Sequence, residues 1–158
     1  MQGDPVKLLV SIAAPLLAGF LGSVFTRRSV ETWYATISKP SFNPPSGVFG
    51  PVWTALYVLM GIAAFLIWRR GLADPRVRTA LIFFLVQLAL NAFWSLAFFG
   101  MRSPLAGAVV ISALWVAILL TMITFFKISS AAGLMLAPYI LWVGFASILN
   151  FSIYFLNR

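Results

Sequence analysis

The chain has 158 residues, of which 62% are hydrophobic and only 9% are charged, with a formal net charge of +8. A soluble domain of this length could not bury so much apolar surface, so the composition excludes a soluble fold and indicates one membrane domain. The absence of cysteine and histidine excludes disulfides and thiol chemistry, and removes the commonest general base and metal or haem ligand. The basic residues lie between apolar runs, where we expect them to contact lipid headgroups and not nucleic acid.

Five apolar runs, each close to the roughly 20 residues that cross the hydrocarbon, predict an all-α fold, an integral membrane bundle of five transmembrane helices. We expect one domain over residues 1–158, with spans at about 8–25, 51–68, 79–99, 105–126 and 133–156. The first run is interpreted as a span and not as a cleaved signal peptide, because no clear small-x-small cleavage site follows it. In this run Ala14, Ala18 and Gly22 recur every four residues, which favours close helix packing, either within the bundle or in a dimer.

Residues 26–50 form a connection longer than a tight turn requires, and such loops often cover binding sites. Its prolines fix φ and lack a backbone donor, so this loop is predicted to be a stiff lid over one end of the bundle. Pro51 is expected in the first turn of the second span, where a missing N–H costs nothing. The residues expected to form the lid are Pro40, Phe42, Pro44, Pro45 and Phe49.

The expected spans contain no Asp, Glu, Lys or Arg, which argues against a proton- or ion-driven transporter and against acid–base or metal-dependent enzymes. They do contain amides and aromatic rings at helical spacing, on one face of the third span and one face of the fifth. Amides in lipid are costly unless paired, so they should face the bundle interior, either as links between helices or as part of a site. The residues expected to bind a ligand are Trp53, Tyr57, Gln87, Asn91, Trp94, Tyr139, Trp142, Ala146 and Asn150.

Depth along the helices brings most of these residues to the half of the bundle beneath residues 26–50. Trp142 lies about 14 residues, or roughly 20 Å, from the end of its span, too deep for the interfacial belt of aromatic residues. An apolar, aromatic pocket with a few amides is the usual composition of a small-molecule site. We therefore expect one pocket under the lid.

The residues of this region also carry a family resemblance. The stretch from Trp33 to Gly61 resembles the signature of the TspO/MBR family, the tryptophan-rich sensory proteins related to the mitochondrial translocator protein. The matching residues are Trp33, Tyr34, Lys39, Pro40, Pro44, Pro45, Phe49, Pro51, Trp53, Leu56, Tyr57, Met60 and Gly61. Gly47 departs from the pattern, because many members carry a large residue there. The third and fifth spans also resemble the family, through Gln87, Leu90, Asn91, Trp94 and Ser95, and through Pro138, Tyr139, Trp142, Ala146, Leu149 and Asn150.

The resemblance implies a five-helix bundle, commonly a homodimer, that binds porphyrins such as protoporphyrin IX, isoquinoline and benzodiazepine drugs, and sterols in some members. It implies a role in tetrapyrrole or stress regulation, in transport, or in light-dependent porphyrin breakdown. Trp53 and Trp142 match two tryptophans implicated in that breakdown and are the catalytic candidates if the activity exists. No metal site or resident cofactor is expected, and iron-free protoporphyrin should bind at least as well as haem.

A loose sterol-contact pattern is formed by Leu149, Tyr154 and Arg158. An interfacial Tyr followed by an interfacial Arg would produce the same pattern without any sterol. The sequence therefore favours a membrane protein that binds porphyrins or related flat hydrophobic ligands. The alternatives are a transporter of that ligand, a light-dependent porphyrin-degrading enzyme, and a sterol or lipid carrier.

Overall fold

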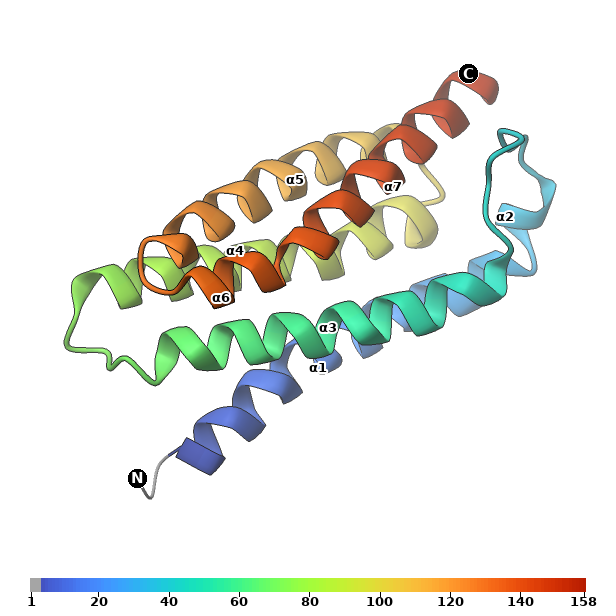
Figure 1. Cartoon of the computed structure of the whole chain (residues 1–158). Coiled ribbons are helices and arrows are strands. Elements are labelled where there is room, and N and C mark those ends of the chain that lie inside the picture. The colour runs from blue at the N-terminus through green and yellow to red at the C-terminus, as the bar shows by residue number, and fades with distance from the viewer. Residues whose placement is uncertain (1–3) are drawn as a thin grey trace.

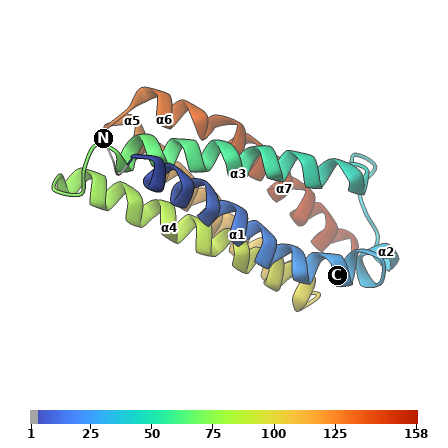
Figure 2. The same ribbon diagram turned by 90° about the horizontal axis from the view of Figure 1, so that it is seen from below.

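The computed structural model describes residues 4–158, and every regular element in that range is a helix (Figure 1). The elements are α1 Asp4–Val30, α2 Trp33–Thr36, α3 Ser46–Trp68, α4 Pro75–Ser95, the π-helix η1 Leu96–Gly100, α5 Pro104–Phe126, α6 Ser130–Met135 and α7 Ala137–Leu156. Five stretches are long and apolar enough to cross a membrane: α1, α3, α4 with η1, α5, and α6 with α7. The predicted five-span, all-α fold is confirmed, and α1 begins and α7 ends at opposite ends of the bundle (Figures 1 and 2).

The second span begins earlier than predicted, at Ser46 and not at Pro51. Pro45 has an extended backbone, and its carbonyl accepts a hydrogen bond from the N–H of Val48 at 3.0 Å, which starts the helix directly after the two prolines. Pro51 consequently lies inside α3, where its ring removes the hydrogen bond to the carbonyl of Gly47. The expectation that Pro51 occupies the first turn was wrong.

The predicted lid loop, residues 26–50, is also shorter than expected. Residues 26–30 continue α1, residues 33–36 form α2, and residues 46–50 belong to α3. The connection without helix over the bundle is therefore residues 37–45, which we call the lid segment. Its short length follows from the prolines, which exclude helix within the segment but permit a helix directly after it.

The third span also begins before its predicted start, because Asp74 caps it. The Asp74 carboxylate accepts a hydrogen bond from the N–H of Arg76 at 2.8 Å, and Pro75 occupies the first helical position. The side chain of Arg76 also hydrogen-bonds this carboxylate and thereby lowers its pKa. Arg76 and Arg78, which the sequence placed in a loop, thus lie in the first turn of α4, beyond the apolar core of the span.

Helix α1 lies along α3 and α4, α4 packs against α5, and α5 packs against α7 (Figure 2). Pro15 lacks the N–H that would bond the Ser11 carbonyl. Gly61 of α3 lies next to this carbonyl, because a Cβ at Gly61 would be only 2.8 Å from the Ser11 oxygen. Three turns further along the same face of α1, a Cβ at Gly22 would lie 2.8 Å from Ser95 Oγ. The small residues of the first span therefore serve packing within the bundle, by letting α1 approach α3 and α4 closely.

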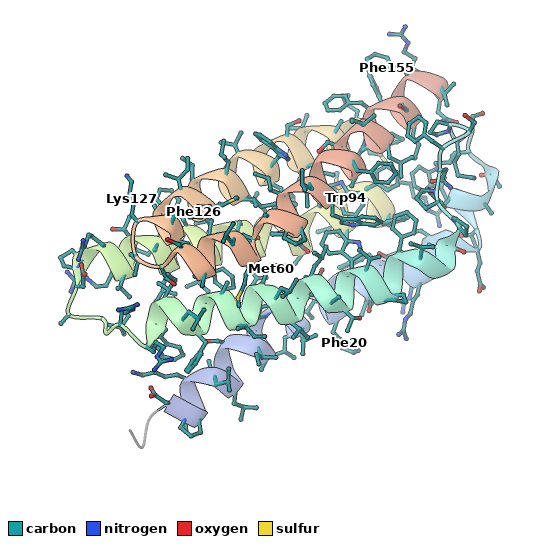
Figure 3. The ribbon with its side chains drawn as sticks, viewed as in Figure 1. Phe20, Met60, Trp94, Phe126, Lys127 and Phe155 are labelled. Atoms are coloured by element: carbon teal, nitrogen blue, oxygen red, sulfur yellow. The ribbon has the colours of Figure 1, made fainter. Side chains whose placement is uncertain are left out.

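The core runs along the centre of the bundle, and the outer faces of the helices are apolar. In Figure 3, Met60 and Trp94 lie among the helices, while Lys127 lies at the end where α5 turns into α6. The largest fully buried side chains include Tyr139, Phe125, Met60, Ile67, Ile111 and Leu114. Exposed leucines, valines and phenylalanines cover the outside, which suits contact with lipid and not with water. The chain is a multi-pass integral membrane protein.

Candidate functional site

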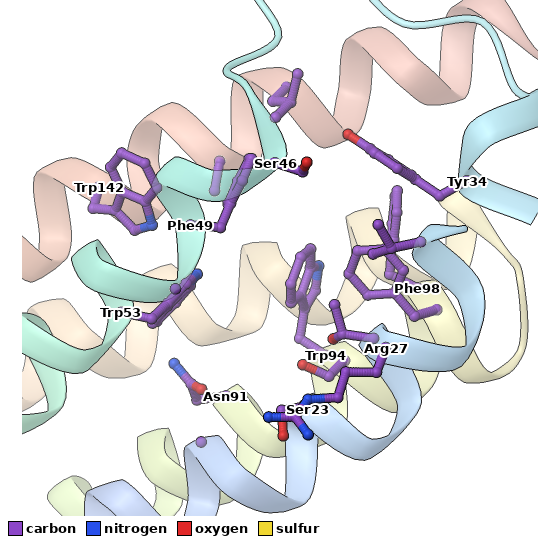
Figure 4. A pocket seen from close by; sticks show the side chains of 18 of the residues that line it. Ser23, Arg27, Tyr34, Ser46, Phe49, Trp53, Asn91, Trp94, Phe98 and Trp142 are labelled. Atoms are coloured by element: carbon purple, nitrogen blue, oxygen red, sulfur yellow. The ribbon is translucent and has the colours of Figure 1, made fainter. Parts of the chain in front are cut away.

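A cavity of about 470 Å³ lies between α1, α3, α7 and the α4–η1 helix, next to the lid segment (Figure 4). This volume is in the range of small-molecule sites. Seven of the nine predicted ligand-binding residues line it: Trp53, Tyr57, Asn91, Trp94, Trp142, Ala146 and Asn150. The wall is thus built from the same face of the third span and of the fifth that the sequence singled out, together with the beginning of α3.

The other two predicted residues, Gln87 and Tyr139, lie behind this wall and do not line the cavity. They continue a chain of hydrogen bonds that begins at the cavity. The Tyr57 hydroxyl donates to Asn91 Oδ1 at 2.8 Å, Asn91 Nδ2 donates to the Tyr139 hydroxyl at 2.9 Å, and that hydroxyl donates to Gln87 Oε1 at 2.7 Å. The chain satisfies these buried polar groups and links α3, α4 and α7. Its members thus hold the deep end of the wall in place.

The three indoles of the cavity differ in their hydrogen bonding. Trp94 Nε1 donates to Asn150 Oδ1 at 3.0 Å, and Asn150 Nδ2 donates in turn to the Pro104 carbonyl at 2.8 Å. Trp53 stacks on Tyr57, with ring centroids 5.5 Å apart. By contrast, Trp142 Nε1 is buried and has no hydrogen-bond partner among the described residues. A buried donor without a partner is uncommon in folded proteins, and it distinguishes Trp142 from the paired indole of Trp94.

The lid segment extends along α7. At its start, the Asn157 side chain holds Ser38 by two hydrogen bonds, accepting from the Ser38 N–H at 2.9 Å and donating to its carbonyl at 2.8 Å. Further along, Phe42 contacts Phe145, with ring centroids 6.3 Å apart. The lid segment is therefore held against α7 by these hydrogen bonds and by this aromatic contact. Within the site, Phe49 of α3 makes a further aromatic contact with α7, because it packs edge-on against the Trp142 ring.

Of the five predicted lid residues, Pro44 and Phe49 line the cavity, whereas Pro40, Phe42 and Pro45 do not. Phe49 lies 5.9 Å from Trp142 between ring centroids and belongs to the first turn of α3, not to a loop. The three residues away from the cavity shape the backbone that carries Pro44.

Tyr34 of α2 connects to two residues of the lid segment, Lys39 and Asn43. Its hydroxyl donates to Asn43 Oδ1 at 2.9 Å, and Lys39 Nζ donates to its carbonyl at 2.7 Å while lying 4.8 Å above its ring. Burial raises the pKa of Tyr34, and the hydrogen bond to Asn43 opposes part of that shift. The tyrosine therefore stays neutral at physiological pH and keeps its hydrogen bond to Asn43 at the mouth of the cavity.

The sequence missed the contribution of α1 to the cavity. Leu16, Gly19, Ser23 and Arg27 line it, at the spacing of one helix face. A side chain at Gly19 would collide with the ring of Tyr57, so α1 and α3 touch at that level. The available signal was Ser23 and Arg27, which are polar residues at the end of an apolar run and continue the helix face of Leu16 and Gly19.

The sequence also missed the π-helix η1, which carries Phe98 and Phe99. Both side chains are almost completely buried, both line the cavity, and their rings are 4.8 Å apart. Because η1 ends at Gly100, the Phe99 carbonyl lies at the helix terminus, and the Ser29 hydroxyl donates to it at 2.7 Å. Single π turns are frequent at functional sites, but nothing in the sequence of residues 96–100 predicts a π turn.

The three residues of the sterol-contact pattern do not share one surface with the cavity. Leu149 is buried and lines the cavity wall, whereas Tyr154 and Arg158 pack on Phe155 near the end of α7. Tyr154 and Arg158 thus occupy the places expected of interfacial residues.

Comparison with known proteins agrees with this architecture. Residues 11–156 match the model of the TspO/MBR family. The chain belongs to the TspO/MBR family. It is 50% identical over 153 residues to the tryptophan-rich protein TspO of Archaeoglobus fulgidus, covering 96% of this chain and 97% of that protein. It is 47% identical over 157 residues to the protein of the same description from Chlorobaculum tepidum, covering 99% of each chain.

The family also includes a human relative. The chain is 37% identical over 145 residues to the translocator protein of Homo sapiens, covering 89% of this chain and 84% of that protein. The family resemblance stated from the sequence is therefore confirmed, and it extends over nearly the whole membrane domain.

Proposed function

We propose that this TspO/MBR-family protein binds porphyrins such as protoporphyrin IX, or related flat hydrophobic ligands, in the cavity beneath the lid segment. The observation that carries the proposal is the cavity itself, about 470 Å³ with Trp53, Trp94 and Trp142 in its wall. Indole faces favour stacking on a flat aromatic ring. Such binding suits a role in tetrapyrrole or stress regulation, or in transport.

The test of this proposal is Ala146→Phe. Ala146 lines the cavity from α7 and is 8% exposed. A cavity of about 150 Å³ is large enough for benzene, so a phenyl ring would take roughly a third of the space available to the ligand. We expect the variant to fold, because the ring enters existing space, and to lose protoporphyrin binding in a titration followed by tryptophan fluorescence quenching.

The matched control is Ala113→Phe, on the exposed side of α5 and outside the cavity. It adds the same ring, and we expect unchanged affinity. Unchanged affinity in a folded Ala146→Phe variant would contradict the proposed site. A parallel titration with haem separates stacking from iron ligation, since stacking alone predicts no advantage for haem.

A second candidate function is light-dependent porphyrin breakdown. Trp53 and Trp142 come from different helices and border one cavity, so both indoles would lie next to a bound photosensitiser. Among the residues lining the cavity there is no carboxylate or imidazole, so the groups available for oxidative chemistry are the indoles and the phenols of Tyr34 and Tyr57. Loss of porphyrin absorbance under illumination, compared with and without the protein, tests this function.

A further inference from the structure

Polar groups are distributed unevenly along the cavity wall of α1. Leu16 and Phe20 lie toward its deep end, whereas Ser23, Thr26 and Arg27 lie toward the lid. Arg27 is the one residue with a formal charge among those lining the cavity. The cavity is therefore apolar and aromatic at one end and cationic near its mouth.

The serine and threonine hydroxyl groups next to Arg27 on α1 already donate hydrogen bonds to backbone carbonyls. Ser23 Oγ donates to the Phe20 carbonyl at 2.7 Å, and Thr26 Oγ1 donates to the Gly22 carbonyl at 3.2 Å. Across the mouth, the Tyr34 hydroxyl donates to Asn43. At this end of the cavity, Arg27 is consequently the charged group with uncommitted donors, and the neutral Asn43 amide and Ser46 hydroxyl are further donors there without an acceptor among the described residues.

Arg27 has no hydrogen-bond or ion-pair partner within residues 4–158, where the one ion pair joins Arg76 to Asp74. Its guanidinium offers five N–H donors in a planar fork, a geometry that suits a carboxylate or a phosphate. Figure 4 places Arg27 and Trp142 on opposite sides of the cavity. A ligand that lies between them would present its apolar ring to the indoles and an anionic group to Arg27.

We propose that Arg27 is the anion-binding group of this cavity, and that the ligand is a flat amphiphile with a carboxylate at one end. This inference rests on the proposed function. It adds a group that recognises the anionic end of the ligand, which the aromatic wall does not contact. It makes the carboxylate, and not the ring alone, a determinant of affinity.

A simpler role for Arg27 is to stabilise the C-terminal end of α1, where a cation interacts favourably with the helix dipole. Arg28 lies in the same last turn and is exposed, as Arg27 is, but it does not line the cavity. Arg27→Gln and Arg28→Gln therefore remove the same charge from the same helix end, and only the first removes it from the cavity.

The experiment compares protoporphyrin IX with its dimethyl ester, which keeps the ring and removes both charges. Binding is measured by tryptophan fluorescence quenching in neutral maltoside micelles, which contain no phosphate. We expect the unmodified protein and Arg28→Gln to bind the free acid about fivefold more tightly than the ester, as for a partly exposed charge-assisted hydrogen bond. Arg27→Gln should bind both forms with the affinity of the ester, and Arg27→Lys should restore part of the difference.

Retention of the full acid preference in Arg27→Gln would overturn the inference, as would its equal loss in Arg28→Gln. Absence of binding for both the acid and the ester in the unmodified protein would overturn the proposed function as well. Repeating the titration in phosphatidylglycerol nanodiscs separates two sources of the anion. Persistence of the acid preference supports a ligand carboxylate, and its disappearance there assigns Arg27 to the lipid phosphate and overturns the inference.

Discussion

Replacement of Tyr139 by phenylalanine tests the hydrogen-bond chain behind the cavity. The hydroxyl of Tyr139 accepts from Asn91 at 2.9 Å and donates to Gln87 at 2.7 Å. Without this hydroxyl, the side-chain amides of Gln87 and Asn91 each lose a hydrogen-bond partner, and both residues are buried, with exposed fractions of 1% and 4%. Interhelical hydrogen bonds in membranes contribute about 0.6 kcal/mol on average and up to about 1.7 kcal/mol, so two of them predict a loss of about 1–3 kcal/mol.

Tyr57→Phe removes only the first bond of this chain, at the cavity surface, and should cost about 0.6 kcal/mol. Tyr154→Phe is the control, because the Tyr154 hydroxyl has no hydrogen-bond partner among the described residues. The measurement is reversible unfolding in mixed detergent micelles, followed by circular dichroism. A Tyr139→Phe variant as stable as the Tyr154→Phe control would refute the reasoning that this chain links the three helices.

Two further predictions concern the indoles and the lid. Trp53→Phe and Trp142→Phe should each keep most porphyrin affinity, because phenylalanine still stacks. Each should abolish light-driven porphyrin breakdown, measured as the fall in porphyrin absorbance, if that activity exists. Trp68→Phe, outside the cavity, should change neither the affinity nor the breakdown. Full breakdown in the double variant would exclude the indoles as the reacting groups. Asn157→Ala should release the start of the lid segment, so that hydrogen exchange of the Ser38 amide becomes about tenfold faster. Unchanged protection of that amide would show that the Asn157 hydrogen bonds do not hold the lid segment.

The sequence determined the elements and the inward faces of this protein. Apolar runs of membrane-spanning length define five helices wherever the chain is solvated by lipid, because only internal hydrogen bonds satisfy the backbone there. Helical periodicity then places Asn91 with Trp94, and Trp142 with Ala146, on faces that must turn inward, since amides and indole N–H groups are costly in lipid. The prolines before α3 likewise restrict the lid segment to an extended connection.

Only the tertiary structure decided which of these faces meet and at what depth. Periodicity fixes the direction of a side chain on its own helix, but not the offset or rotation of the neighbouring helix. From the sequence, Tyr139 was grouped with the cavity residues. In the structure it lies behind the wall, where its long side chain donates a hydrogen bond to Gln87 of α4. The position of Arg27 likewise depends on how two helices pack. Gly19 lets α1 pack closely on α3, and this packing places the last turns of α1, with Arg27, at the mouth of the cavity.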